Sequence, residues 1–190
     1  IAMDAPPRWK GPDADRLART AIVHVTPGLD GVSRAVNEAE RGLLPAEATI
    51  VCGQPLAVDP SRAPEGSWIV WIQLQELPAG RVKGDAAGEL DVGDGTWTEE
   101  LREAYADRIV ARLGDSIENL EAATLKRVTL SPADLEQVNC NLVAGDINGQ
   151  LDIFVRDRLL GTTELVSVAT GGTQSDGYST YGHISGNGQI

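Results

Sequence analysis

The segment from Trp68 to Glu76 constrains the fold more than any other part of the sequence. Its side chains alternate with the period of two that is typical of a β-strand. One face is wholly apolar and carries Trp68, Val70, Ile72 and Leu74. The other face combines apolar surface with amides and carries Ile69, Trp71, Gln73 and Gln75. We therefore predict one continuous strand over 68–76, with an apolar face for the core and an amphiphilic second face.

Two shorter segments also predict strands. From Ala21 to Thr26, Ala21, Val23 and Val25 share one face, and the following Pro27-Gly28 pair ends the pattern. Ala48–Cys52 is a second short apolar run of strand length. The chain also opens on Ile1-Ala2-Met3, which we interpret as a strand entered midway, followed by an extended, proline-rich connection over 4–12.

Helical spacing appears in four places. Leu29–Arg41 predicts an amphipathic helix that ends at Gly42, with an apolar face made of Leu29, Val32, Val36 and Ala39. Thr96–Glu99 matches a capping box, and a long helix to Gly114 should follow and bury Leu101, Tyr105, Ile109 and Leu113. Short helices are expected over 13–20 and, after the cap signal at 131–134, up to about Asn139. The acid- and glycine-rich stretch 79–95 is expected to be a surface loop.

These elements mix strands and helices without a regular βαβ repeat, so we predict an α+β (mixed α/β) fold in which helices pack on a sheet. Composition changes near Arg156, and from Leu159 to Ile190 glycine, serine and threonine dominate. We therefore predict a folded domain over 1–155 and a divergent tail over 156–190, either mobile or an irregular cover.

Charge and cysteine content limit the classes of function. The chain has 16 Lys and Arg against 28 Asp and Glu, a formal charge of -12 that would repel nucleic acid and anionic lipid. Its 2 cysteines, Cys52 and Cys140, form no CxxC pair, so neither a zinc knuckle nor a redox dithiol is indicated. We expect no transmembrane segment, no signal peptide and a cytoplasmic location.

Three sequence patterns have some features of catalytic or metal sites. His183 lies near Asp176 and Ser179, but the spacing does not supply the geometry of a serine triad. The alternating acids and amides over 146–152 lack the glycine and glutamate of a calcium loop and indicate a turn. The segment 91–95 is likewise interpreted as turn chemistry. No glycine-rich phosphate-binding string occurs, so we assign no cofactor-binding and no metal-binding residue.

Three residues remain as candidates for substrate binding, namely His24, Trp71 and Gln73. His24 is either a proton donor or a structural residue in mid-strand. Trp71 and Gln73 share a strand face that suits a pocket wall and equally suits packing under a helix. No residue is assigned a catalytic role.

Several strings resemble segments of phytoene-dehydrogenase-like FAD-dependent oxidoreductases, including the pyridine nucleotide-disulphide oxidoreductase domain proteins. They are IVHVTPGLDGVS at 22–33, ATIVCGQP at 48–55, DPSRAPEG at 59–66, WIQLQELP at 71–78 and SPADLE at 131–136. The resemblance covers roughly residues 1–151. It departs after the region of Phe154, where the family has an arginine-proline pair and Arg156 is instead followed by Asp157.

The resemblance implies the substrate-side portion of a two-domain flavoprotein. In such an enzyme FAD lies in a Rossmann-like domain, whose glycine-rich motif would precede Ile1, and a hydrophobic small molecule is held against it for hydride transfer at flavin N5. FAD is thus implied for the full-length parent, whereas this chain alone is expected to be inactive. The alternatives are a non-catalytic ligand-binding domain derived from such an enzyme and a fragment that self-associates as a homo-oligomer.

Overall fold

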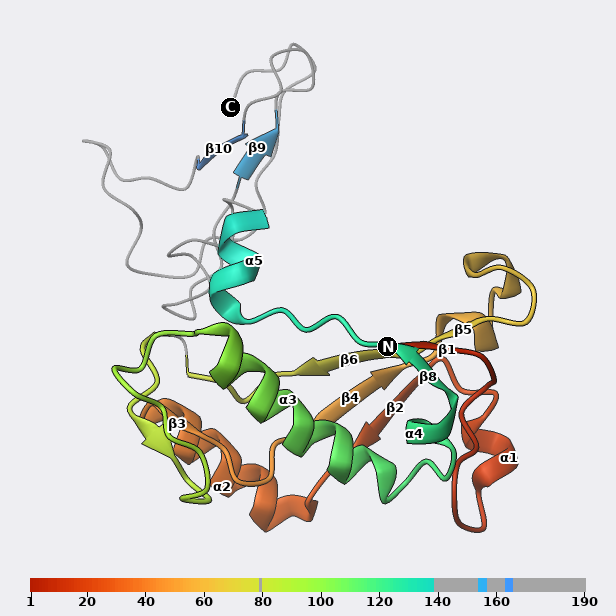
Figure 1. Cartoon of the computed structure of the whole chain (residues 1–190), viewed down its shortest axis with the longest axis horizontal. Helices are drawn as coiled ribbons and strands as arrows, with labels where there is room; N and C mark the ends of the chain where they lie inside the picture. The colour runs from red at the N-terminus through yellow and green to blue at the C-terminus, as the bar shows by residue number, and fades with distance from the viewer. Residues whose placement is uncertain (79, 139–153, 157–162, 166–190) are drawn as a thin grey trace. The chain divides into compact units, whose positions relative to one another are not determined.

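The computed structural model describes residues 1–78, 80–138, 154–156 and 163–165. The chain divides into two compact units, Ile1–Ser131 and Pro132–Ile190. Helices and mainly antiparallel sheets combine in the first unit, which confirms the predicted α+β class (Figure 1).

A three-stranded antiparallel sheet lies at the centre of the first unit. Its strands are β2 (Ile22–Val25), β4 (Ile50–Gly53) and β6 (Trp71–Leu74), in the order β2-β4-β6. The register places Val23, Cys52 and Ile72 in one row across the sheet. Val23 and Cys52 are buried, so this row belongs to the inner face of the sheet. The strands predicted over 21–26 and 48–52 are therefore confirmed.

The single strand predicted over 68–76 is wrong in one respect, because it divides at Val70. Its first part, β5 (Trp68–Ile69), belongs to a second sheet, with β1 (Ala2–Met3) in the middle and β8 (Thr124–Lys126) beyond it. Val70 exchanges backbone hydrogen bonds of 2.9 and 3.0 Å with Ile1, whereas the residues after it pair with β4. The chain stays extended but changes partner, and the predicted alternation of faces persists.

Helix α3 (Glu99–Gly114) supplies the largest helical part of the core. Its buried residues are Leu101, Tyr105, Ile109 and Leu113, as predicted, and they join the inner face of the sheet in one apolar cluster. Figure 1 shows α3 running across the β2-β4-β6 sheet. The N-cap is Thr98, whose hydroxyl accepts the amide of Leu101 at 3.2 Å. The predicted N-cap at Thr96 is thus wrong by two residues.

Helix α2 (Gly28–Glu40) forms where predicted, and Gly42 follows its end with a positive φ of 84°. Its predicted apolar face is confirmed for Val32 and Ala39, which are half-buried, but not for Leu29 and Val36. Leu29 is 87% exposed and Val36 is 45% exposed, whereas Ala35 is buried. The inward side of the helix is thus centred on Ala35, with Val32 and Ala39 beside it.

Short elements complete the first unit. They are α1 (Ala14–Leu17), α4 (Leu120–Ala123), the 3₁₀ turns Pro55–Ala57 and Pro60–Arg62, and the parallel pair β3 (Leu43–Leu44) and β7 (Gly84–Asp85). The helix predicted over 13–20 is present but shorter. The described residues of 79–95 are more than the predicted surface loop, because β7 and buried Val82 fix them to the domain.

Asp85 anchors this loop to α3. Its carboxylate accepts two hydrogen bonds from the Arg108 guanidinium, at 2.7 and 2.6 Å, and the amides of Glu89 and Leu90 at 2.9 and 3.0 Å. The Asp85 side chain is only 1% exposed. Burial acts to raise its pKa, but the hydrogen bonds from Arg108 and the two amides, with the Arg108 charge, outweigh burial and lower the pKa to about 2.

The second unit contains helix α5 (Pro132–Val138), which follows Ser131 as predicted, and the antiparallel pair β9 (Phe154–Arg156) and β10 (Thr163–Leu165). Most residues of the predicted tail lie outside the described part of the chain. The predicted division at 155/156 falls within β9, and the segments 139–153 and 157–162 on either side of this strand lie outside the described residues, so that division stays a prediction. The described helices are all too short or too polar to cross a bilayer.

We predict that replacing Asp85 by asparagine lowers the free energy of unfolding by about 3 kcal/mol at pH 7, because it leaves the Arg108 charge without its buried partner. The native pKa of Asp85 lies below its usual 3.8, so its ionisation stabilises the fold above about pH 4 and ceases to do so as the pH falls towards 2. Urea unfolding should therefore show that the difference in free energy of unfolding between wild type and variant becomes smaller below about pH 4.

Asp91→Asn is the matched control, since Asp91 is an exposed aspartate of the same loop that accepts only the Gly93 amide. It should cost less than about 1 kcal/mol. An Asp85→Asn effect no larger than this control, or one that does not change with pH, would show that the ion pair does not anchor the loop.

Candidate functional site

The three predicted substrate-binding residues lie on one face of the β2-β4-β6 sheet. We call it the outer face, and it is formed by Ile22, His24, Val51, Gly53, Trp71 and Gln73. The register aligns His24, Val51 and Gln73 in one row across the strands, and Ile22, Gly53 and Trp71 in the next. Because neighbouring strands are about 5 Å apart, His24 and Gln73 lie about 10 Å from each other with Val51 between them.

This face is exposed because the alternation of each strand assigns its other face to the core. Val23, Cys52 and Val70 are buried with the apolar side of α3, so the residues between them point away from it. Trp71 is 68% exposed and Ile22 is 56% exposed. Within the described residues, the alternative that Trp71 and Gln73 pack under a helix is therefore excluded.

On the outer face, Gly53 lies between Ile22 and Trp71 and has no side chain to cover its backbone. A β-carbon at Gly53 would lie 3.5 Å from that of Trp71, an ordinary contact distance, and the backbone there does not require glycine. A glycine inside a strand often marks a place where a ligand approaches the backbone closely. The row Ile22–Gly53–Trp71 thus places a residue without a side chain between two exposed apolar ones.

The chemistry available on the outer face is that of binding. The side chains of His24, Trp71 and Gln73 have no hydrogen-bond or ion-pair partner among the residues that the structure describes. No carboxylate orients His24, so the described residues form neither a triad nor a proton relay around it. The face offers apolar surface from Ile22 and Trp71 and hydrogen-bonding groups from His24 and Gln73.

Cys52 lies behind this face, in the row between Val23 and Ile72. It is a buried free thiol, and burial raises its pKa to about 12. A thiol that stays protonated at neutral pH is a poor nucleophile, so Cys52 serves packing rather than catalysis.

The described residues do not fit the diphosphate of FAD. The turn from β2 into α2 is a strand-to-helix turn with glycine, but β2 is antiparallel to its partner and Asp30 places a carboxylate in the first helical turn. The glycine at position 31 is explained by packing, since a β-carbon there would lie 2.5 Å from that of Pro27. Nothing at this turn therefore requires a bound phosphate.

The described residues contain no group of three or more histidine, cysteine or acidic side chains that could hold a metal ion. The turn interpretation of 91–95 is confirmed, because Asp91 accepts the Gly93 amide and Asp94 accepts the Thr96 amide, both at 2.9 Å. The patterns at 146–152 and around His183 lie outside the described residues.

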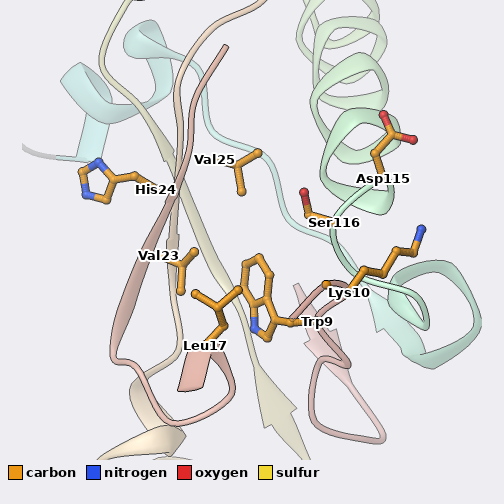
Figure 2. A pocket seen from close by; sticks show the side chains of 9 residues that line it. Trp9, Lys10, Leu17, Val23, His24, Val25, Asp115 and Ser116 are labelled. Carbon is orange, nitrogen blue, oxygen red and sulfur yellow. The ribbon is translucent and has the colours of Figure 1, made fainter. Parts of the chain in front are cut away.

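A groove that no sequence pattern predicted lies on the inner side of β2, next to α1 and the end of α3. Figure 2 shows Trp9, Leu17, Val23 and Val25 gathered in it, while the imidazole of His24 points to the opposite side of the strand. The groove joins segments near residues 9, 23 and 115, which local patterns do not connect. His24 therefore borders it only through its backbone.

No protein-family model, no curated protein and no solved structure matches the chain.

We predict that the purified chain retains no FAD, because the described residues offer no site for its diphosphate. The measurement is an absorbance spectrum after incubation with excess FAD and desalting, with FAD alone passed through the same column as control. Flavin bands that co-elute with the protein in a one-to-one ratio would contradict this prediction.

Proposed function

We propose that the outer face of the β2-β4-β6 sheet binds an apolar small molecule, and that the chain is the substrate-side portion of an FAD-dependent oxidoreductase of the phytoene-dehydrogenase-like type. The observation that carries the proposal is the convergence of His24, Trp71 and Gln73 on one exposed face, in two adjacent rows. These residues lie within two of the strings on which the resemblance rests.

The composition of the outer face supports an apolar ligand with few polar groups. Ile22 and Trp71 stand on either side of Gly53 and offer apolar surface that water covers in the free chain. Removing such surface from water is favourable by about 25 cal/mol per Å². His24 and Gln73, one row away, add groups that can orient a polar end of the same molecule.

In this proposal the chain holds and orients the substrate and excludes water from one side of it. The reaction class that the resemblance implies is a dehydrogenation or desaturation by hydride transfer to FAD, which would be held by a different region of a longer protein. His24 stays a candidate proton donor, and no catalytic residue is assigned. A reducing, cytoplasmic location belongs to the proposal and agrees with the buried free thiol of Cys52.

A second candidate is a non-catalytic domain that uses the same face for ligand binding or for self-association. The large apolar side chains exposed on the outer face favour it, since such patches often mark interfaces. Light scattering over a range of concentrations separates the two candidates. A monomer at high concentration favours small-molecule binding, whereas a dimer that Trp71→Ala dissociates favours self-association.

We predict that Trp71→Ala weakens the binding of Nile red, a neutral apolar dye, by about tenfold, because the substitution removes the largest apolar group of the outer face. The dissociation constant is measured from the rise in dye fluorescence. Leu29→Ala is the matched control, since Leu29 is another highly exposed apolar residue but lies on α2. It should change the constant less than about twofold; equal effects of both substitutions would count against a specific site.

A further inference from the structure

The groove beneath β2 has the size and lining of a binding site separate from the outer face. Its volume is about 380 Å³, within the usual range of ligand pockets. The floor is apolar and is formed by Trp9, Leu17, Val23 and Val25. Trp9 is only 7% exposed, and its indole N–H donates to Gln54 Oε1 at 3.0 Å, so the floor is held rigidly.

The rim of the groove carries one positive and one negative side chain. Lys10 and Asp115 both border the groove (Figure 2), but the Lys10 ammonium already donates to the Gly114 carbonyl at 2.9 Å. The Asp115 carboxylate is exposed and has no partner among the described residues. The rim thus offers Asp115 as an ion-pair partner for a positive charge, and the preference for a basic ligand follows from this carboxylate together with the net charge of -12.

The wall of the groove is the free edge of a β-sheet. Within the described residues β2 pairs only with β4, so its other edge has no partner strand. The amide of Gln54 donates to the carbonyl of Ala21 at 2.7 Å, so these two residues form a hydrogen-bonded pair. Such pairs alternate with non-hydrogen-bonded ones along an antiparallel ladder. Ile22 and His24 must then direct their backbone N–H and C=O groups to the free edge, which is why His24 borders the groove through its backbone.

We propose that this groove binds an extended basic peptide that adds to the edge of β2 as a further strand. Alternating donors and acceptors along an edge are satisfied by another extended backbone, and pockets beside the edge then select alternate side chains. Apolar side chains of the peptide enter the floor between Leu17 and Val25, and a lysine or arginine pairs with Asp115. The net charge of -12 attracts a basic peptide over longer distances.

The same net charge disfavours a second copy of the chain as the occupant. Two copies that met edge to edge would each bring a charge of -12 and a free Asp115 carboxylate to the junction. Like charges brought together oppose association, most strongly at low ionic strength. A partner of opposite charge meets no such barrier.

The test uses a fluorescein-labelled, end-blocked peptide of sequence Lys-Val-Thr-Val-Thr-Val-Lys and measures its anisotropy against increasing protein. Consecutive amides of a strand point to opposite edges, so two analogues are compared, one N-methylated at its valines and the other at its threonines. Strand addition predicts that only one of these analogues loses affinity, by about tenfold or more. A third analogue with glutamate in place of both lysines should bind more weakly than the parent peptide.

Two variants of the protein locate the site. His24→Pro removes an amide donor from the free edge, where proline is tolerated, and should weaken binding about tenfold, whereas His24→Ala keeps the amide and should change it less than about twofold. Asp115→Lys should reduce the preference for the lysine peptide over the glutamate peptide, because it removes the local ion pair while the net charge stays negative. Circular dichroism and thermal unfolding show whether each variant is folded. If His24→Pro does not fold, the methylated peptides still test the proposal on the wild-type chain.

Three results of the peptide experiments would overturn the proposal. They are absence of peptide binding, equal loss with both methylated analogues, or an Asp115→Lys variant with unchanged preference. A chain that takes up no peptide but forms a dimer that His24→Pro dissociates would also overturn it, in favour of a second copy. Because Trp71 lies on the other face of the sheet, failure of Nile red binding would not affect this result.

Discussion

The packing of one helix on one side of the central sheet determines what the rest of the first unit can do. Helix α3 presents a single apolar stripe, including Tyr105 and Leu113, to the inner face of β2-β4-β6. Because side chains alternate along each strand, covering the inner face leaves the outer face exposed. Ile109, between these two residues, is buried in the same stripe.

Two different surfaces follow from this arrangement. On the outer face, side chains from all three strands are brought side by side, with the indole of Trp71 next to the bare backbone of Gly53. At the free edge of β2, backbone N–H and C=O groups are available for hydrogen bonds with a ligand. The apolar groove lies beneath this edge, and Asp115 lies at its rim. The first surface suits a compact apolar molecule and the second suits an extended chain, because one offers side chains and the other offers backbone hydrogen bonds.

Local periodicity predicted much of this fold but not its long-range pairing. The spacing from Leu101 to Leu113 identified the buried stripe of α3, and the alternation over 68–76 identified the face that Trp71 and Gln73 share, but not that it is exposed. The division of that strand at Val70 was not predictable, since alternation does not reveal which strand lies alongside. The contact between Asp85 and Arg108 and the groove were missed for the same reason: they join residues that are far apart in the sequence.

The most direct test of the central claim follows the indole N–H signals of the 4 tryptophans by NMR while Nile red is added. Trp71 is the exposed one on the outer face, whereas Trp9 is buried in the groove and Trp68 and Trp97 pack against the core. We expect the Trp71 signal to move progressively while the other three signals stay in place. Movement of Trp9 or Trp97 with a stationary Trp71 would contradict this expectation.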